Sequence, residues 1–380
     1  MSGPAQDERG QVLEPLLDYG CSHWRTSSQR AADLYDSGVK LWRKEDLVDI
    51  ERQLARSCTA EKFTVRRIDG SIVHIKNPMF GVQKPIWRPY VKFQEFWHLV
   101  RSTPDGPPQT YHCTYLVDWT NQTVRNYEGP IENVRLLFKT SQQRWGASAT
   151  CEALKSQLRK LLGGDGNAKK VTKIVCFGLG DMNRKPPDWW RIENNTNPED
   201  EREPETSVVE GAFVHHAIAL TMADVARSCA KGDAGARLLT QDPDYSDETK
   251  DILQNIGFEV VGEYGAGGFA ELDDESVVIS AFTASPVKQI IADLARPVAI
   301  ICAGRTSDGV FNKFQYLIPL PLPWFQLMCA PPRKPYADPE SPRTRQMWKG
   351  YESRKFPVQS EDGKMEGSLH QLEIYARIGE

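Results

Sequence analysis

Lys173-Ile174-Val175-Cys176-Phe177-Gly178-Leu179-Gly180-Asp181 is an apolar run that stops abruptly at two glycines. The run predicts a buried parallel strand, and the glycines predict a tight turn at its carboxyl end. Such a turn lets backbone N–H groups approach a ligand closely, most often one that carries a phosphate or a ribose. We therefore expect Gly178, Gly180 and Asp181 to contact a ligand.

From this run the predicted strands and helices alternate to about residue 305. Strands are predicted at 171–177, 236–241, 258–261, 277–282 and 298–302, and helices at 208–229, 247–256 and 286–294. This alternation favours an α/β, Rossmann-like parallel sheet with helices on both faces. Ligands of such sheets bind at the carboxyl ends of the strands. The expected ligand edge comprises residues 178–181, 241–244, 262–268 and 280–285.

The flanking regions predict two further domains. Asp69-Gly70 lies between two short apolar runs and predicts a hairpin, and residues 110–126 predict a second strand pair with its turn near Thr120-Asn121-Gln122. The aromatic residues of 87–97 are expected to join this lobe to the next one, with a substrate surface as the alternative. We expect an α+β N-terminal lobe at 1–150, a Rossmann-like domain at 151–310, and a proline-rich segment with a basic helical tail at 311–380.

The composition excludes several classes of protein. The net charge of −4 gives no overall attraction to nucleic acid, so any such binding needs a local basic patch. No apolar run approaches the ~18 residues of a membrane span, and the first residues lack the pattern of a signal peptide. The eight cysteines show no CxxC and no metal-binding spacing. We expect a cytoplasmic protein with reduced thiols, no bound metal and no membrane partner.

The order of motifs in residues 170–305 resembles the domain named after the plant "sensitivity to red light reduced" protein. The matching landmarks are Cys176-Phe177-Gly178-Leu179-Gly180, His215-His216-Ala217-Ile218-Ala219-Leu220, Gln241-Asp242-Pro243-Asp244-Tyr245 and residues 253–257. Residues 286–297, Pro-Val-Lys-Gln-Ile-Ile-Ala-Asp-Leu-Ala-Arg-Pro, look like the fungal branch of this family. The plant and animal members place Pro-His-Cys after the fourth strand, where this chain has Ser280 to Ser285. The resemblance implies a Rossmann-like fold and does not by itself supply a reaction.

The fungal type of resemblance implies an arginine-containing cyclodipeptide synthase of secondary metabolism. Such enzymes join two aminoacyl groups from charged tRNAs, here arginyl-tRNA and a second one, into a diketopiperazine. A DDxxE signature belongs to that group, and Asp273-Asp274-Glu275 is the nearest match, with its glutamate two positions too early. Aminoacyl esters are already activated, so no ATP site and no other cofactor is expected.

This chemistry needs carboxylates for the guanidinium of arginine and a base for the attacking amine. The acidic candidates follow predicted strands and are expected on the ligand edge: Asp242, Asp244, Glu263, Asp273 and Asp274. Asp273 and Asp274 are the catalytic candidates among them, and the alternative is that both acidic pairs form turns. His216 shares a helix face with Phe213 and Leu220, so it is either a hydrogen-bonded core residue or a general base.

A basic helix at 151–162 is the candidate tRNA-binding element. Leucines form its apolar stripe, and cations lie outside this stripe and shortly after the helix: Lys155, Arg159, Lys160, Lys169 and Lys170. Phosphate contacts need such local cations, although an ordinary solvated helix face has the same pattern. Two other functions stay open: a non-catalytic regulatory protein like the plant family members, and a nucleotide- or S-adenosylmethionine-dependent enzyme. The missing third glycine weakens the latter.

Overall fold

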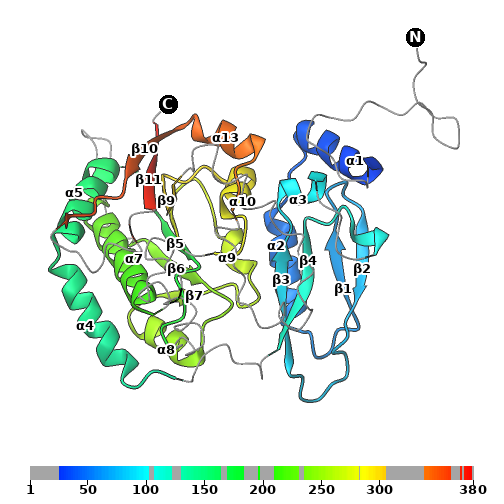
Figure 1. Cartoon of the computed structure of the whole chain (residues 1–380), viewed down its shortest axis with the longest axis horizontal. Helices are drawn as coiled ribbons and strands as arrows, with labels where there is room; N and C mark the ends of the chain where they lie inside the picture. Colours follow the sequence, from blue (N-terminus) through cyan, green and yellow to red (C-terminus); the bar gives the residue numbers. More distant parts are fainter. Residues whose placement is uncertain are drawn as a thin grey trace, which may run out of the picture.

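Strands that alternate with helices form the parallel part of a central sheet (Figure 1). The computed structural model describes residues 25–101, 107–121, 130–163, 169–183, 196, 209–230, 235–281, 283–304, 338–360, 369 and 372–378. The parallel strands are β5 (Lys173–Phe177), β6 (Arg237–Gln241), β7 (Glu259–Val260), β8 (Ser276–Ser280) and β9 (Ala299–Ala303). The intervening helices are α7 (Glu210–Cys229), α8 (Asp247–Asn255), α9 (Gly267–Ala270) and α10 (Val287–Leu294). The predicted Rossmann-like α/β fold is confirmed.

The strand order determines where a ligand would bind in such a sheet. In the described residues the sheet has seven strands in the order β10-β11-β9-β8-β5-β6-β7, where β10 is Tyr351–Lys355 and β11 is Leu372–Arg377. The chain runs outward from β5 through β6 and β7, and then returns to β8 on the other side of β5. The carboxyl ends of β5 and β8 therefore flank the topological switch point, where ligands of open α/β sheets bind.

The last part of the chain differs from the helical tail that the sequence predicts. Among the described residues after 337, the short helix α13 (Pro342–Trp348) is followed by β10 and β11, which extend the main sheet. Strand β11 runs antiparallel to β9, with Leu372 opposite Ala303. Its Ile374 and Tyr375 are buried on opposite faces of the sheet. The basic composition of this segment does not predict a strand inside the sheet.

Both faces of the sheet are covered (Figure 1). One face packs against α4 (Val134–Gly146), α5 (Ala149–Gly163), α7 and α8, and receives Ile174 and Cys176 of β5. The other face packs against α9, α10, α13 and the N-terminal lobe, and receives Val175 and Phe177. This two-sided burial accounts for the continuous apolar run that opens the domain. Helix α4 was not predicted from the sequence.

The N-terminal lobe contains two small antiparallel sheets. Its elements are α1 (Arg25–Asp36), α2 (Lys44–Leu54), β1 (Lys62–Arg66), β2 (Ile72–Lys76), β3 (Trp87–Phe93), α3 (Phe96–Arg101), the 3-10 helix Pro108–Thr110 and β4 (Tyr115–Asn121). The Asp69-Gly70 hairpin is confirmed, because β1 pairs with β2. The second prediction is wrong: β4 is one continuous strand through Thr120, and its partner is β3. Residues 122–126 lie outside the described residues.

The lobe docks on the sheet through aromatic residues and one backbone bond. The Val91 N–H donates to the Tyr264 carbonyl at 2.8 Å. Phe269 stacks on Phe177 with ring centroids 4.3 Å apart, and meets Phe93 edge-on at 5.3 Å. Phe93 therefore acts as a core residue that joins the lobe to the sheet, as the sequence predicts for this aromatic group.

Candidate functional site

The glycine turn after β5 lies beside the end of β6, as expected. Gly178 and Gly180 have φ angles of 59° and 90°, a region that favours glycine. The Gly178 N–H donates to the Gln241 carbonyl at 3.1 Å, and the Gly180 N–H donates to Oδ2 of Asp242 at 3.1 Å. Both N–H groups of the turn therefore form hydrogen bonds within the chain.

The acidic residues of this turn also bind backbone groups. Asp181 accepts hydrogen bonds from the Asn183 N–H at 2.7 Å and from the Ser246 N–H. Oδ1 of Asp242 accepts the Asp244 N–H at 3.0 Å. These are the contacts of carboxylates that hold turns, which is the structural alternative considered for Asp242 and Asp244.

His216 lies in a buried chain of hydrogen bonds below this turn. Its Nδ1 is 2.7 Å from the Ala212 carbonyl, and its Nε2 is 2.8 Å from the Tyr245 hydroxyl, which is 2.7 Å from Oγ1 of Thr240. A carbonyl accepts only, so Nδ1 carries the proton and the tyrosine donates to Nε2. Burial lowers the pKa of His216 to about 3. A fully buried, neutral imidazole that binds its neighbours on both sides is a core residue and not a general base.

The neighbouring His215 is buried as completely as His216. Burial lowers its pKa to about 4, against a smaller opposing effect of the Leu179 backbone in the glycine turn. Both imidazoles are therefore neutral, because burial disfavours their charged form.

The predicted position of Asp273 and Asp274 is wrong. Both precede β8, and Asp273 pairs with Lys173, the first residue of β5, at 3.0 Å. Asp274 accepts the Arg296 N–H at 2.6 Å, just before β9. They therefore lie at the amino edge of the sheet, a strand length of about 13 Å or more from the glycine turn. After β7 the chain returns through α9 to the far edge, which the sequence pattern does not show.

Glu263 does lie at the carboxyl edge, where its exposed side chain contacts the N-terminal lobe. Arg88 of β3 donates to the Glu263 carboxylate at 3.1 Å and to its carbonyl at 2.7 Å, and also to the Pro243 carbonyl at 3.2 Å. Lys250 approaches the same carboxylate at 3.8 Å. Glu263 therefore anchors the lobe to the ends of β6 and β7.

A second carboxylate from the lobe enters the glycine-rich loop 262–268. Glu51 of α2 accepts the N–H groups of Tyr264, Ala266 and Gly267 at 2.8, 2.9 and 3.0 Å. Backbone N–H groups that converge in this way bind anions, and here the anion belongs to the chain itself. Burial is the largest influence on Glu51 and raises its pKa, although the three N–H donors oppose this effect. No local pattern in the sequence predicts this contact.

The other half of the carboxyl edge holds a different set of charged groups. We name it the Lys288 cluster: Lys288, Cys302, Asp338, Glu340 and Glu373. Lys288 lies in the first turn of α10, Cys302 near the end of β9, and Glu373 opposite Cys302 on β11. Both Asp338 oxygens accept the Lys288 backbone N–H, at 3.1 and 3.0 Å. The sequence analysis did not select any member of this cluster.

The charges of the Lys288 cluster are unequal and partly buried. The carboxylates of Asp338, Glu340 and Glu373 act on the charge of Lys288, and Glu95 of the N-terminal lobe adds a fourth carboxylate that acts on Asp338. The pKa of Asp338 is raised to about 7, mainly by burial, with an opposing effect of Lys288 and smaller contributions from Glu340 and Glu95. A carboxyl group with a pKa near neutrality can both accept and return a proton at physiological pH.

Most of the predicted tRNA-binding cations have partners within the fold. Glu152 lies 3.7 Å from Lys155 and 3.2 Å from Arg159, in each case between nitrogen and carboxylate oxygen. Lys169 donates to the Arg377 carbonyl at 2.7 Å, and Lys170 pairs with Glu275 at 2.9 Å. Lys160 is exposed on α5. Exposed pairs of this kind are weak, so they can exchange for phosphate contacts.

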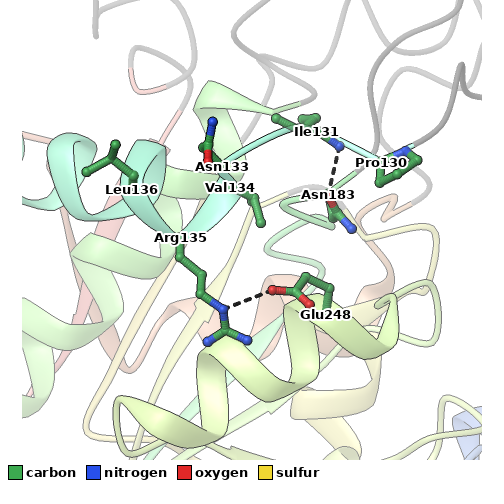
Figure 2. Close-up of a pocket in the computed structure, with 8 residues that line it drawn as sticks. All are labelled: Pro130, Ile131, Asn133, Val134, Arg135, Leu136, Asn183 and Glu248. Carbon is green, nitrogen blue, oxygen red and sulfur yellow. Dashed lines mark hydrogen bonds and ion pairs between the residues drawn. The ribbon is translucent and has the colours of Figure 1, made fainter.

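A pocket of about 410 Å³ opens beside the glycine turn, at the start of α4 (Figure 2). Oδ1 of Asn183 accepts the Ile131 N–H at 2.9 Å at one end of it. Arg135 pairs with Glu248 of α8 at 3.0 Å at the other. The lining is part apolar and part charged, with Leu136 exposed on its rim. This pocket neighbours the carboxyl edge on the side away from the Lys288 cluster.

Comparisons with known proteins found no match to this chain among family models, curated proteins or solved structures. Among the described residues no helix has the length and apolar character needed to cross a bilayer. Nor do the described residues contain a group of three or more histidine, cysteine, aspartate or glutamate side chains arranged to hold a metal ion. Function must therefore be argued from the site.

Proposed function

We propose that this chain is an aminoacyl-tRNA-dependent transferase that forms an arginine-containing cyclic dipeptide. One observation carries the proposal: the Lys288 cluster gathers carboxylates beside the switch point of a Rossmann-like sheet. A guanidinium pairs with carboxylates, and an excess of them over the single ammonium favours a cationic substrate. The substrate carboxylates are then Asp338, Glu340 and Glu373, in place of Asp181, Asp242, Asp244 and Glu263.

Acyl transfer from two charged tRNAs asks little of the protein beyond positioning and proton transfer. The α-amine of one aminoacyl group attacks the ester carbonyl of the other, an amide bond forms, and the ribose hydroxyl of the tRNA leaves with a proton. A second attack of the same kind closes the ring. Asp338, with a pKa of about 7, is suited to take the proton of the attacking amine.

The tRNA partner has weaker support. Lys155, Arg159, Lys160, Lys169 and Lys170 lie on α5 and just before β5, which places the later ones at the amino edge of the sheet. A tRNA held there would have to reach around the sheet to bring its acceptor end to Asp338. A charged-tRNA substrate supports a cytoplasmic reaction, and the resemblance implies a fungal secondary pathway.

The test is expression of the chain in a bacterium and mass spectrometry of diketopiperazines in the medium. The wild-type chain is expected to release products that carry arginine, and Asp338→Asn to release at least about a hundredfold less, the lower end of the usual contribution of a general base. Asp274→Asn is the matched control, because Asp274 is an exposed acidic residue at the opposite edge. A soluble wild-type chain without any new diketopiperazine contradicts the proposal.

A regulatory protein without catalysis is the second candidate. This candidate is favoured because other groups of the chain hydrogen-bond to the side chains of His216, Asp181, Asp242 and Glu51. The polar groups in the glycine-turn half of the carboxyl edge are thus bonded within the fold. On this view the substitution of Asp338 leaves the cellular role intact, whereas loss of the lobe contact at Glu51 abolishes it. The product assay separates the two candidates directly.

A further inference from the structure

Strand β2 is an exposed edge of the small β1–β2 sheet in the N-terminal lobe. It pairs with β1 on one side, and among the described residues no strand pairs with its other side. In Figure 1 this strand lies at the outer side of the lobe, away from the main sheet. An exposed strand edge presents a row of backbone donors and acceptors that another chain can bind.

The hydrogen-bond pattern of the hairpin shows which backbone groups of β2 are open. The Asn77 N–H donates to the Glu61 carbonyl at 2.9 Å, so this pair is a hydrogen-bonded pair of the ladder. Bonded and non-bonded pairs alternate along an antiparallel ladder. The N–H and C=O groups of Ile72, His74 and Lys76 therefore point away from β1. In the part of the chain that the structure describes, these outward groups have no hydrogen-bond partner.

The opposite edge of the same sheet is closed by side chains. The Thr64 N–H donates to Oε1 of Gln53 at 2.6 Å, and Nε2 of Gln53 donates to the Thr64 carbonyl at 3.0 Å. The Arg66 N–H donates to the Tyr115 hydroxyl at 3.2 Å. A side-chain amide of α2 thus bonds to β1 as a neighbouring strand would. The fold satisfies outward groups of β1 and leaves those of β2 open.

The side chains of this sheet are basic. Its ten strand residues include Lys62, Arg66, His74 and Lys76 and no acidic residue. Arg66 pairs with Asp46 at 2.9 Å. Lys62 and Lys76 are both exposed, stand directly opposite each other in the register, and make no ion pair with any described residue. Like charges in this position destabilise a strand pair, and a carboxylate beside them would offset this effect.

Exposed apolar side chains are concentrated in and after β2. Half of the large apolar side chains that are exposed among the described residues lie within 72–86: Ile72, Phe80, Val82 and Ile86. Single exposed apolar residues are common on protein surfaces, whereas a concentration of them is typical of a binding surface. A partner on this edge therefore meets apolar side chains as well as positive charge.

We propose that the free edge of β2 binds an extended acidic segment of another protein by strand addition. The backbone of that segment pairs with the outward groups of β2, and its carboxylates lie beside Lys62 and Lys76. A second copy of β2 would bring basic side chains together, so charge disfavours self-pairing. A single-stranded nucleic acid matches the charge but has no backbone N–H for the outward carbonyls. This surface takes no part in the proposed acyl transfer.

The test is fluorescence anisotropy of a labelled peptide of about seven residues that alternates glutamate and valine, titrated with the full chain. The wild type is expected to bind this peptide at least about tenfold more tightly than a peptide in which lysine replaces glutamate. When the acidic peptide saturates the chain, hydrogen exchange at the Ile72, His74 and Lys76 amides should slow by at least about tenfold, because these amides become bonded.

Two variants test the backbone and the charge separately. His74→Pro removes one outward N–H, which an edge strand tolerates because this N–H makes no bond to β1. It is expected to weaken binding of the acidic peptide at least about tenfold. Lys76→Glu reverses an exposed charge, is expected to weaken binding by a similar factor, and decides the matter if His74→Pro does not fold. Lys355→Glu, on the exposed edge strand β10 of the main sheet, is the matched control and leaves the affinity unchanged.

Several results would overturn the inference. The first is equal affinity for the acidic and basic peptides, or no binding of the acidic peptide at about 1 mM. The second is unchanged hydrogen exchange at the three amides of β2 in the saturated chain. The third is equal weakening by Lys76→Glu and Lys355→Glu. Binding of an oligothymidylate of the same charge as tightly as the acidic peptide, with no effect of His74→Pro, would show that the surface recognises charge alone.

Discussion

Glu51→Ala removes the carboxylate that holds the N-terminal lobe on the glycine-rich loop. Three backbone N–H groups, those of Tyr264, Ala266 and Gly267, then lose their acceptor. A buried donor left without a partner costs about 1–3 kcal/mol, so three donors give an upper range of about 3–9 kcal/mol. The raised pKa shows that burial of Glu51 is itself costly, which offsets part of this loss. We expect the free energy of unfolding to fall by about 3–5 kcal/mol.

Urea unfolding measures this change, and two variants separate its causes. Glu51→Gln keeps one oxygen acceptor without the charge, and is expected to cost about 1–2 kcal/mol. Glu45→Ala removes an exposed glutamate from the same helix and is expected to cost less than about 1 kcal/mol. Hydrogen exchange at the Tyr264, Ala266 and Gly267 amides should accelerate only in the Glu51 variants. Equal stability of Glu51→Ala and Glu45→Ala would refute the lobe contact described above.

Two further predictions concern the buried histidines and the glycine-rich loop 262–268. The folded pKa values of His216 and His215, about 3 and 4, lie below the usual 6.5, so their stabilisation is complete above pH 6.5 and is lost as the pH falls. Each histidine adds a slope of up to about 1.4 kcal/mol per pH unit, between pH 6.5 and 4, to the free energy of unfolding. His216→Gln should remove about half of the combined slope, measured as urea midpoints against pH. Gly262→Ala places a Cβ 1.8 Å from Oε1 of Gln241 at a φ of 62°, whereas Gly257→Ala, at a φ of 96°, meets nothing within 4 Å. Thermal unfolding should show Gly262→Ala to be the more destabilising by at least about 2 kcal/mol, and similar melting temperatures would contradict this packing.

The sequence predicts the parallel half of the fold well, because local pattern decides it. The run 173–177 is buried on both faces, and its two glycines end it at the residues expected. The pairing of β11 with β9 is a contact between distant segments, and no periodicity in 372–377 distinguishes it from an edge strand elsewhere. The same holds for β3 and β4: the sequence predicts no strand at 87–93, and these residues pair with 115–121.

The site was predicted less well than the fold, for two physical reasons. Asp273 and Asp274 follow β7 by more than ten residues, and only the course of the chain through α9 reveals that they directly precede β8. Lys288 was part of the motif 286–297, but a lone lysine in a first helical turn is normally exposed, and its burial depends on segments far along the chain. Glu51 gives no local signal either, since its partners are 213 to 216 residues away.

The central claim is that chemistry belongs to the carboxyl edge beside β8 and β9, and not to the acidic turn before β8. The most direct measurement compares diketopiperazine release by Asp338→Asn and Asp274→Asn, each expressed as a soluble chain in the same bacterial strain. The account predicts product from Asp274→Asn at the wild-type level and little from Asp338→Asn. Loss of product in Asp274→Asn with full release by Asp338→Asn would contradict it.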